Sequence, residues 1–406
     1  MRIAVWHNLR SGGGKRALYH QVAGLVARGH QLEIWCPPTA DASVLPLRDL
    51  APEHVLPLDE PSRAERRSPY RRTTGMLERI DDHCRRCAVE IDRGRFDVLL
   101  AHPCVLTRAA PIGRHLRLPK VLYLQEPFRS LYEASPELPW RALSIPRRAS
   151  LHQIRRYLRD LSKVQGLRVQ VREEWRSASA YDGILVSSLF SRESVRRAYG
   201  LESRVCRLGI DAALFAPGRA VREPFIVSVG GLDVHKGAER AIDALAAIPS
   251  SRRPPLVWIG NYVSERYRGR VAERAVAAGV ALRVETAVSD AALVDLLQRA
   301  SAMLYVPILE PFGLAPLEAN ACETPVVAIA EGGVRETIED GVNGFLLPDG
   351  DPAALADRLS SLLGDPERAR AIGRRARQRV LERWDWAGAV DRLEAHLQAA
   401  VRARIA

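Results

Sequence analysis

Glu310 and Glu318 are the first candidates for chemistry in this sequence of 406 residues. Glu310 follows an apolar run that we expect to be a buried strand, and Pro316 is suited to begin the helix that carries Glu318 in its first turn. Ligands of open α/β sheets bind beside the carboxyl ends of the strands. The pair could therefore bind hydroxyl groups, form an acid/base couple, or consist of a loop carboxylate and one that only complements a helix dipole.

Glycine-rich loops follow the first expected strand of each half of the sequence. Residues 10–15 contain three consecutive glycines, and Gly230-Gly231 is followed by Lys236-Gly237, which opens an expected helix. The spaced glycines of a dinucleotide fingerprint are missing, and no acidic residue ends the second strand, so the pattern argues against nicotinamide binding. The glycines instead permit a ligand to approach the backbone closely.

Strands and helices alternate through both halves, which predicts two doubly wound α/β domains facing one another. The expected strands are Arg2–Trp6, Gln31–Cys36, Phe96–Ala101, Lys120–Leu124, Asp182–Ser188, Phe225–Val229, Leu256–Gly260, Leu282–Val284, Ala302–Pro307, Val326–Ile329 and Phe345–Leu347. The expected helices are Ala17–Arg28, Met76–Ile91, Ala238–Ile248, Asp290–Arg299, Leu317–Cys322 and most of 352–406. The stretch 216–224, rich in Pro, Gly and Arg, is the expected boundary between the domains.

The composition is that of a protein with two well-buried domains and no membrane span. The N-terminus enters a strand directly, which argues against a secretory signal, and no stretch has the roughly 20 apolar residues of a transmembrane helix. Six scattered cysteines indicate free thiols in a reducing cytoplasm. Cys84 and Cys87, preceded by His83, form the only close cysteine pair, but no second pair completes a zinc site and the segment resembles a charged helix.

The positive charge belongs to the first half of the chain. Residues 1–215 hold 36 Lys and Arg and 23 Asp and Glu, whereas residues 216–406 hold 24 and 25. Such a basic half favours an anionic partner, although a solvated arginine-rich surface explains the charge equally well. Residues 140–172 combine basic side chains with leucines at helical spacing, which is typical of a helix packed on a sheet or, alternatively, of a face for an anionic membrane or acceptor.

An ordered series of motifs resembles glycosyltransferase family 4, over nearly the whole length and most densely from 225 to 348. The motifs are Gly12-Gly13, Arg28-Gly29-His30, Ser188, Leu208-Gly209-Ile210-Asp211 with Phe215-Ala216-Pro217, Asp233-Val234-His235-Lys236-Gly237, Glu310-Pro311-Phe312-Gly313 with Glu318, Thr324-Pro325-Val326-Val327 and Gly341 with Asn343-Gly344-Phe345. The resemblance implies the GT-B fold, with two Rossmann-like domains facing across a cleft. It implies an acceptor-side domain over 1–215, a nucleotide-sugar domain over 216–385 and a C-terminal helix over 386–406 that packs on the first domain.

The resemblance also implies roles for individual residues on the donor side. Glu310, with the backbone N–H groups of Phe312, Gly313 and Leu314, would contact the donor sugar, and Glu318 would hold the ribose hydroxyls. Lys236 would bind the diphosphate as a point charge, and Gly13 and Gly14 would let the first helix approach the same group. The residues suggested for the acceptor side are His102, Gln125, Glu126 and Arg129.

The family implies retention of anomeric configuration, and the absence of an Asp-x-Asp-like site predicts no metal and no cofactor besides the nucleotide-sugar co-substrate. Two departures concern the phosphate and sugar sites: Gly231 stands where an arginine is usual, with Arg16 and Arg129 as substitutes, and Gln125-Glu126 stands where a histidine is common. Glu126 could bind the acceptor or cap a turn. A third departure is Glu323, in place of the usual glycine before Thr324-Pro325.

These features predict a cytoplasmic transferase that moves a sugar from a nucleotide diphosphate to a hydroxyl acceptor. The basic first half extends the prediction to an anionic or lipid-linked acceptor and to contact with the inner face of the cell membrane. The alternatives are a sugar phosphorylase, a nucleotide-sugar epimerase and a catalytically silent paralogue that binds a nucleotide sugar. Nucleic-acid binding is disfavoured because no recognition motif accompanies the basic half.

Overall fold

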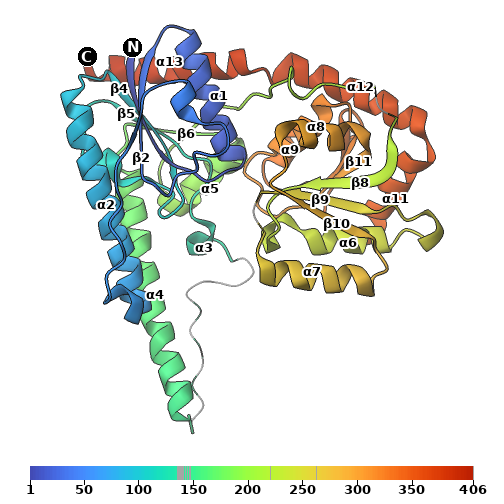
Figure 1. The fold of residues 1–406 in the computed structure, drawn as a ribbon, viewed down its shortest axis with the longest axis horizontal. Coiled ribbons are helices and arrows are strands. Elements are labelled where there is room, and N and C mark those ends of the chain that lie inside the picture. The colour runs from blue at the N-terminus through green and yellow to red at the C-terminus, as the bar shows by residue number, and fades with distance from the viewer. Residues whose placement is uncertain are drawn as a thin grey trace. The chain divides into compact units, whose positions relative to one another are not determined.

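A computed structural model describes residues 1–134, 141, 143, 145, 148–219, 221–261 and 263–405. The chain forms two compact units, each with its own parallel sheet (Figure 1). Unit 1 comprises Met1–Ser187, Arg192–Arg207 and Val390–Ala406, and unit 2 comprises Ser188–Ser191 and Leu208–Ala389. The divisions therefore fall at 207/208 and 389/390, where the sequence suggested 215/216 and 385/386.

The sheet of unit 1 has seven parallel strands in the order β3-β2-β1-β4-β5-β6-β7. Its strands are β1 Arg2–Asn8, β2 Gln31–Cys36, β3 Glu53–Val55, β4 Val98–Cys104, β5 Lys120–Tyr123, β6 Gly183–Val186 and β7 Arg204–Val205. Its helices are α1 Gly13–Ala27, α2 Pro69–Arg93, α3 Arg129–Tyr132 and α4 Leu151–Ala178, and α5 Leu189–Tyr199 begins in unit 2 and continues into unit 1. β1 and β4 are buried along almost their whole lengths, as expected for central strands of a parallel sheet.

The sheet of unit 2 has six parallel strands in the order β10-β9-β8-β11-β12-β13. Its strands are β8 Glu223–Val229, β9 Leu256–Gly260, β10 Leu282–Thr286, β11 Ala300–Tyr305, β12 Val326–Ile329 and β13 Gly344–Leu347. Its helices are α6 Ala238–Ala246, α7 Glu265–Ala277, α8 Asp290–Arg299, α9 Leu314–Ala321, α10 Val334–Thr337, α11 Pro352–Gly364 and α12 Pro366–Arg383. In Figure 1, α6 and α7 lie on one side of this sheet, and α8 and α9 lie on the other.

Both sheets place their first strand beside their fourth, so each unit has the strand order of a dinucleotide-binding fold. The strand order reverses between β1 and β4 in unit 1 and between β8 and β11 in unit 2. Loops that follow these strands diverge to opposite faces of the sheet and leave a crevice at the strand ends. The α/β fold class with two doubly wound units, expected from the sequence, is confirmed.

Helix α13, Trp386–Ile405, begins in unit 2 and belongs to unit 1 from Val390 onward. There Val390 fills the space beside Gly24 of α1, where a Cβ would lie 2.4 Å from a Val390 methyl group. Arg28 at the end of α1 donates to Asp391, and His30 lies 3.0 Å from a carboxylate oxygen of Glu394. The terminal helix is thus held to α1 by close packing and by charged groups.

The structure corrects three expectations about local structure. Helix α2 begins at Pro69, seven residues before the expected Met76, because Pro69 occupies a first-turn position that needs no N–H donor. Strands β3 and β7 were missed because they have only three and two residues. The Leu208–Asp211 motif, which resembles the interdomain strand of the family named above, makes only an isolated bridge between Ile210 and Asp385.

The basic segment predicted over 140–172 is helical from Leu151, while 140, 142, 144, 146 and 147 lie outside the described residues. The expected packing is found only in the second half of this helix. The buried residues of α4 begin at Val164, and the half before it has none. Within the described ranges, no helix combines the length and the apolar character needed to cross a membrane.

Candidate functional site

The loops after β8 and β11 meet beside the switch point of unit 2. The first loop carries Lys236 and the second carries Glu310. Lys236 Nζ donates to Glu310 Oε2 at 2.8 Å, and the two side chains are only 26% and 10% exposed. Two residues that the sequence suggested separately as ligand-binding groups are therefore brought together as a sheltered ion pair.

Lys236 is positioned by a short turn with little freedom. The Asp233 side chain accepts from the His235 N–H at 2.8 Å and caps the single 3₁₀ turn Val234–Lys236. Gly237 then adopts a left-handed conformation with φ of 77°. A Cβ on Gly237 would lie 2.2 Å from the carbonyl oxygen of Val306, so only glycine lets α6 begin here against the end of β11.

The loop that carries Glu310 is fixed by neighbouring backbone. The Gly333 N–H donates to the Glu310 carbonyl at 2.7 Å, and a Cβ on Gly332 would lie 2.1 Å from the same oxygen. The Ser188 hydroxyl donates to the Pro311 carbonyl at 2.5 Å. The positioning role of these three residues was not predicted from the sequence, although the paired glycines after β12 were a signal of close backbone approach.

Helix α9 begins directly after this loop, at Leu314. Gly313 precedes it in a left-handed conformation with φ of 98°, and Phe312 is buried with its ring 5.4 Å from that of Trp384. Pro316 falls in the first turn, where a missing N–H is tolerated, so the helix starts earlier than the expected Leu317. The first turn of a helix presents N–H groups with no partner within the helix, which suits an anionic or hydroxylated ligand.

Glu318 lies in the second turn of α9, one turn later than the sequence suggested, and is 6% exposed. Helix α9 is held by two buried amides: Asn343 Nδ2 donates to Asn320 Oδ1, and Asn320 Nδ2 donates to the Asn343 carbonyl, both at 2.9 Å. Burial, and then the charge of Glu318, raises the pKa of Cys322 to about 12. The carboxylate of Glu318 is therefore sheltered on a helix that is held by Phe312 before it and by Asn320 after it.

The loop after β8 has Gly231 where the family usually has an arginine. The backbone around Gly231 is closely packed. The neighbouring Gly230 carbonyl accepts from Trp258 Nε1 at 2.9 Å, and a Cβ on Gly260 would lie 2.5 Å from that oxygen. Arg240 on α6 places a second cation at this strand end, with Nη1 3.4 Å from the Val306 carbonyl. Arg240 was not predicted as a site residue, because in the sequence its position on a helix surface resembles that of any solvated arginine.

In unit 1, Gly13 and Gly14 form the first turn of α1, and Gln125 lies against them. A Cβ on Gly14 would be 2.6 Å from Gln125 Nε2, so the glycine is needed for this contact. Glu126 and Arg129, proposed for the acceptor side, pair with one another at 2.5 Å, and Arg108 lies 3.7 Å from the other Glu126 oxygen. Arg129 is thus already partly neutralised, which weakens it as a replacement for the missing phosphate-binding arginine.

His102 lies inside β4, two residues before its end, and is fully buried, unlike a residue that contacts an acceptor in solvent. Its ring stacks on Tyr123 with centroids 5.5 Å apart, and neither ring nitrogen has a hydrogen-bond partner among the described residues. Burial, aided by the charges of His7 and Lys15, lowers the pKa of His102 to about 3. We therefore place neutral His102 in the core beneath the switch point of unit 1.

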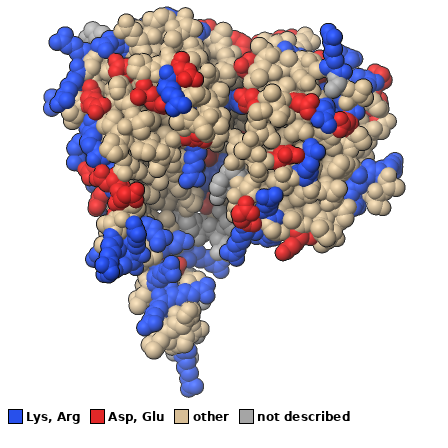
Figure 2. Space-filling model, in the orientation of Figure 1, with Lys and Arg blue, Asp and Glu red and all other residues tan. Residues whose placement is uncertain are grey.

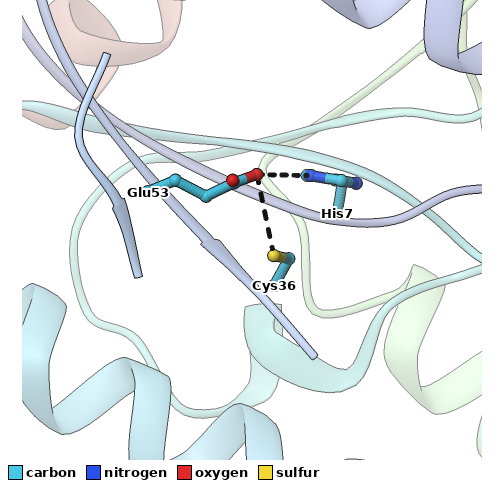
Figure 3. Close-up of side chains that lie close together, drawn as sticks. All are labelled: His7, Cys36 and Glu53. Atoms are coloured by element: carbon cyan, nitrogen blue, oxygen red, sulfur yellow. Dashed lines mark hydrogen bonds and ion pairs between the residues drawn. The ribbon is translucent and has the colours of Figure 1, made fainter. Parts of the chain in front are cut away.

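His7, Cys36 and Glu53 form a buried polar cluster on three neighbouring strands (Figure 3). Glu53 Oε1 lies 4.0 Å from His7 Nε2 and 3.9 Å from Cys36 Sγ, and all the potential ligand atoms lie within 4.8 Å of one another. Imidazole, thiolate and carboxylate are zinc ligands, so the spacing alone permits a metal.

Two features of the surroundings oppose a cation in this cluster. The Leu9 N–H donates to His7 Nδ1 at 3.4 Å, which leaves the ring proton on Nε2, the atom that faces Glu53. The buried Lys15 ammonium is also close enough to help lower the pKa of His7, after the larger effect of burial. Attraction to His7 in turn lowers the pKa of Glu53. We assign the cluster to a buried charge network.

The six cysteines are free and buried, as the sequence predicted. Cys84 and Cys87 belong to the core that packs between α2 and the sheet of unit 1, and Cys87 Sγ lies 3.4 Å from His83 Nε2. Burial raises the pKa of both thiols, that of Cys87 to about 12. These residues are therefore neutral core side chains of a long helix.

Comparison with known proteins adds sequence evidence for unit 2. Residues 210–379 match the family model described as Glycosyl transferases group 1. D-inositol 3-phosphate glycosyltransferase of Xylanimonas cellulosilytica is 33% identical over 267 residues, which cover 60% of this chain and 62% of that protein. Glycogen synthase of Mycobacterium tuberculosis is 33% identical over 221 residues, covering 50% and 51%. The matches thus span between half and two thirds of these relatives.

Solved structures match over the whole length, at low identity. Anabaena Alr3699/HepE in complex with UDP-glucose superposes with a TM-score of 0.73 at 18% identity, covering 98% of this chain and 100% of that one. Sucrose-phosphate synthase from Thermosynechococcus elongatus gives 0.72 at 19% identity, covering 99% and 100%. The chain therefore has the two-unit α/β fold of GT-B glycosyltransferases, and its second unit carries the sequence features of glycosyltransferase group 1.

Proposed function

We propose that this chain is a glycosyltransferase that moves a sugar from a nucleoside-diphosphate sugar to a hydroxyl acceptor. The observation that carries the proposal is the Lys236–Glu310 pair at the switch point of unit 2, within the residues that match the glycosyltransferase model. The names of the relatives and of the UDP-glucose complex support the same class of reaction.

The ion pair suits transfer from a nucleotide donor because one ammonium group has three donors. Lys236 can donate to Glu310 and still reach an oxygen of the leaving diphosphate, where positive charge stabilises the transition state. Glu310 keeps lone pairs for the hydroxyls of the donor sugar, and the N–H groups at the start of α9 add donors beside it. Glu318, sheltered on the same helix, is assigned to the two ribose hydroxyls.

We further propose that the reaction retains anomeric configuration and needs no metal. Glu310 is paired with a cation, which makes it a poor nucleophile and supports attack by the acceptor on the face of the leaving diphosphate. The charge of Lys236, with Arg240 at the same strand end, supports a site that neutralises phosphate without a divalent ion. Full turnover after treatment with a chelator is the expected result, and recovery only on addition of Mg²⁺ or Mn²⁺ would contradict it.

The acceptor is proposed to be an alcohol on an anionic or lipid-linked molecule, because the basic residues concentrate in the first half of the chain. The buried position of His102 removes it from the proposed acceptor contacts, whereas Gln125 and Glu126 remain. The cytoplasmic location expected from the sequence stays a prediction.

The test is a panel of UDP-, GDP- and ADP-sugars, with binding measured by calorimetry and turnover measured as release of the nucleoside diphosphate. We expect one nucleotide class to bind and its sugar to be released or transferred. Turnover that requires inorganic phosphate and no nucleotide would favour a phosphorylase, and interconversion of nucleotide sugars would favour an epimerase. Binding without turnover in the presence of acceptor alcohols would favour the silent paralogue that Gly231 suggested.

A further inference from the structure

The first half of α4 projects from unit 1 with its side chains exposed or half-buried. Helix α4 has 28 residues, and its buried side chains run from Val164 to Ala178. None of residues 151–163 is buried. Figure 1 shows this part of α4 extending past the N-terminal end of α2, its neighbour in the unit. A helical segment of between three and four turns is therefore presented to the surroundings.

One face of the projecting segment is apolar. Leu151, Ile154, Leu158 and Leu161 follow one another at intervals of three, four and three residues, which places them on one helical stripe. Their side chains are 77%, 40%, 58% and 39% exposed. Scattered apolar residues are normal on a protein surface, but an aligned stripe on a projecting helix marks an interaction site.

The polar side of the projecting segment is basic. Residues 151–163 contain Arg155, Arg156, Arg159 and Lys163, against one acidic residue, Asp160. The Ser162 hydroxyl lies 3.0 Å from that of Ser68, and this contact brings the start of α2 beside α4. The start of α2 and the turn before it add four exposed arginines: Arg66, Arg67, Arg71 and Arg72.

None of these eight cations forms an ion pair within the described part of the chain, so the positive charge is uncompensated. In Figure 2 blue atoms crowd over the projecting segment and around its base, with little red among them.

The first turn of the segment is also fixed by its own cap. Ser150 and Gln153 form a reciprocal cap: the Gln153 N–H donates to Ser150 Oγ at 3.3 Å, and the Ser150 N–H donates to Gln153 Oε1 at 2.8 Å. The cap holds the first turn, where an unsupported helix would otherwise fray. A helix that is already formed loses little conformational entropy on binding.

We propose that the projecting half of α4, with the arginines at the start of α2, docks the protein on an anionic phospholipid surface. The leucine stripe enters the boundary between headgroups and acyl chains, and the arginines bind the lipid phosphates. A second copy of the chain fits less well, because stacking two such helices would oppose cations of like sign. Nucleic acid would pair with the arginines but leave the leucine stripe exposed to water. The proposal goes beyond sugar transfer and does not depend on it.

The experiment is co-sedimentation of the full chain with vesicles of phosphatidylcholine alone or with about a third phosphatidylglycerol. We expect binding to the anionic vesicles only, and weaker binding at high salt. Leu158→Glu should weaken it on the order of tenfold or more, and Arg155→Gln with Arg159→Gln about fivefold for each charge removed. The two matched controls lie on α7 of unit 2: Val276→Glu replaces an 81% exposed valine, and Arg266→Gln removes an exposed arginine.

Several results would overturn the proposal. These are equal binding to neutral and anionic vesicles, no binding to either, or the same loss from the α7 controls as from the α4 variants. A dimer that Leu158→Glu converts to a monomer would assign the stripe to a second copy. Binding to duplex DNA that is tighter than binding to vesicles and is unaffected by Leu158→Glu would assign the arginines to nucleic acid. Sugar-nucleotide turnover by Leu158→Glu in the absence of vesicles reports separately on the proposed function.

Discussion

Removing the charge of Lys236 separates the two roles that its ion pair with Glu310 could have. If the pair only stabilises the fold, loss of Lys236 harms the protein by leaving a carboxylate unpaired. If Lys236 also binds the diphosphate, its loss harms transfer even when the fold is intact. Lys236→Met, Glu310→Gln and the double variant form a cycle that distinguishes these possibilities.

The structure sets the expected size of the stability effect. Removing one partner of a fully buried ion pair costs about 3–5 kcal/mol. Lys236 is 26% and Glu310 10% exposed, so water can reach the remaining charge and the cost falls to about 1–3 kcal/mol. In the double variant the unpaired charge is gone, and most of that loss should be recovered. The measurement is urea unfolding followed by hydrogen exchange in peptides of β8 and β11, which gives the free energy of unfolding of unit 2 separately from that of unit 1.

Activity should behave differently from stability. Loss of one electrostatic group that stabilises a transition state lowers kcat by about 10²–10³, equivalent to about 2.7–4 kcal/mol. We expect the double variant to regain stability while remaining as inactive as Lys236→Met. The reasoning is refuted if transfer returns together with stability, because Lys236 would then only support Glu310.

Three further substitutions test other parts of the account. Glu318→Gln should weaken nucleotide binding by about 1.5–3 kcal/mol, measured by calorimetry, because an ionised acceptor for the ribose hydroxyls is lost; an unchanged Kd would remove Glu318 from the nucleotide site. Glu323→Gly should raise the free energy of unfolding by about 0.5–1 kcal/mol, because Glu323 has a φ of 60°, which glycine adopts without strain. The measurement is the thermal midpoint, and an unchanged midpoint would mean that this backbone is unstrained.

Glu174→Gln tests a pH dependence. Burial raises the pKa of Glu174 from 4.5 to about 8 in the folded state. Because the folded state holds a proton that the unfolded state loses, the free energy of unfolding should fall as pH rises from about 4.5 to 8. The variant should lack this fall, worth up to about 3–5 kcal/mol, and parallel urea-unfolding profiles for variant and parent across that range would contradict the shift.

The alternation of strands and helices could be predicted because each element has a local signature. Strands β2, β9 and β12 and helix α8 begin and end where the sequence placed them, since apolar runs and turn residues mark both ends. The starts of α2 and α9 could not be placed in this way. At α9, the left-handed Gly313 lets the helix begin before Pro316, and that conformation depends on the loop being packed against Val334 and Thr337.

The members of the candidate site were predictable, but their contacts were not. Lys236 and Glu310 both stood out as residues after strand ends, yet their pairing joins positions 74 residues apart through loop conformations that no local pattern specifies. The same is true of Glu126, whose second partner, Arg108, lies in a separate loop with positive φ. His102 was misplaced because the apolar run ends at Ala101, whereas β4 continues through His102 to Cys104 and holds the side chain in the core.

The projecting half of α4 shows the opposite case. Its sequence pattern allowed two interpretations, a packed helix or an exposed interaction face, and the exposure of its side chains excludes the packed helix for this half. Leucines at helical spacing are expected in a packed helix. In this chain the stripe at Leu151, Ile154 and Leu158 is exposed, and packing begins only at Val164. Whether a neighbouring element covers a stripe depends on tertiary structure, which periodicity does not encode.

The most direct test of the central claim is release of nucleoside diphosphate from UDP-, GDP- and ADP-sugars by the unaltered chain and by Lys236→Met, side by side. The account predicts release from at least one donor by the unaltered chain and a loss of about 10²–10³ in the variant. No release and no binding for every donor, or equal release by the two proteins, would contradict it.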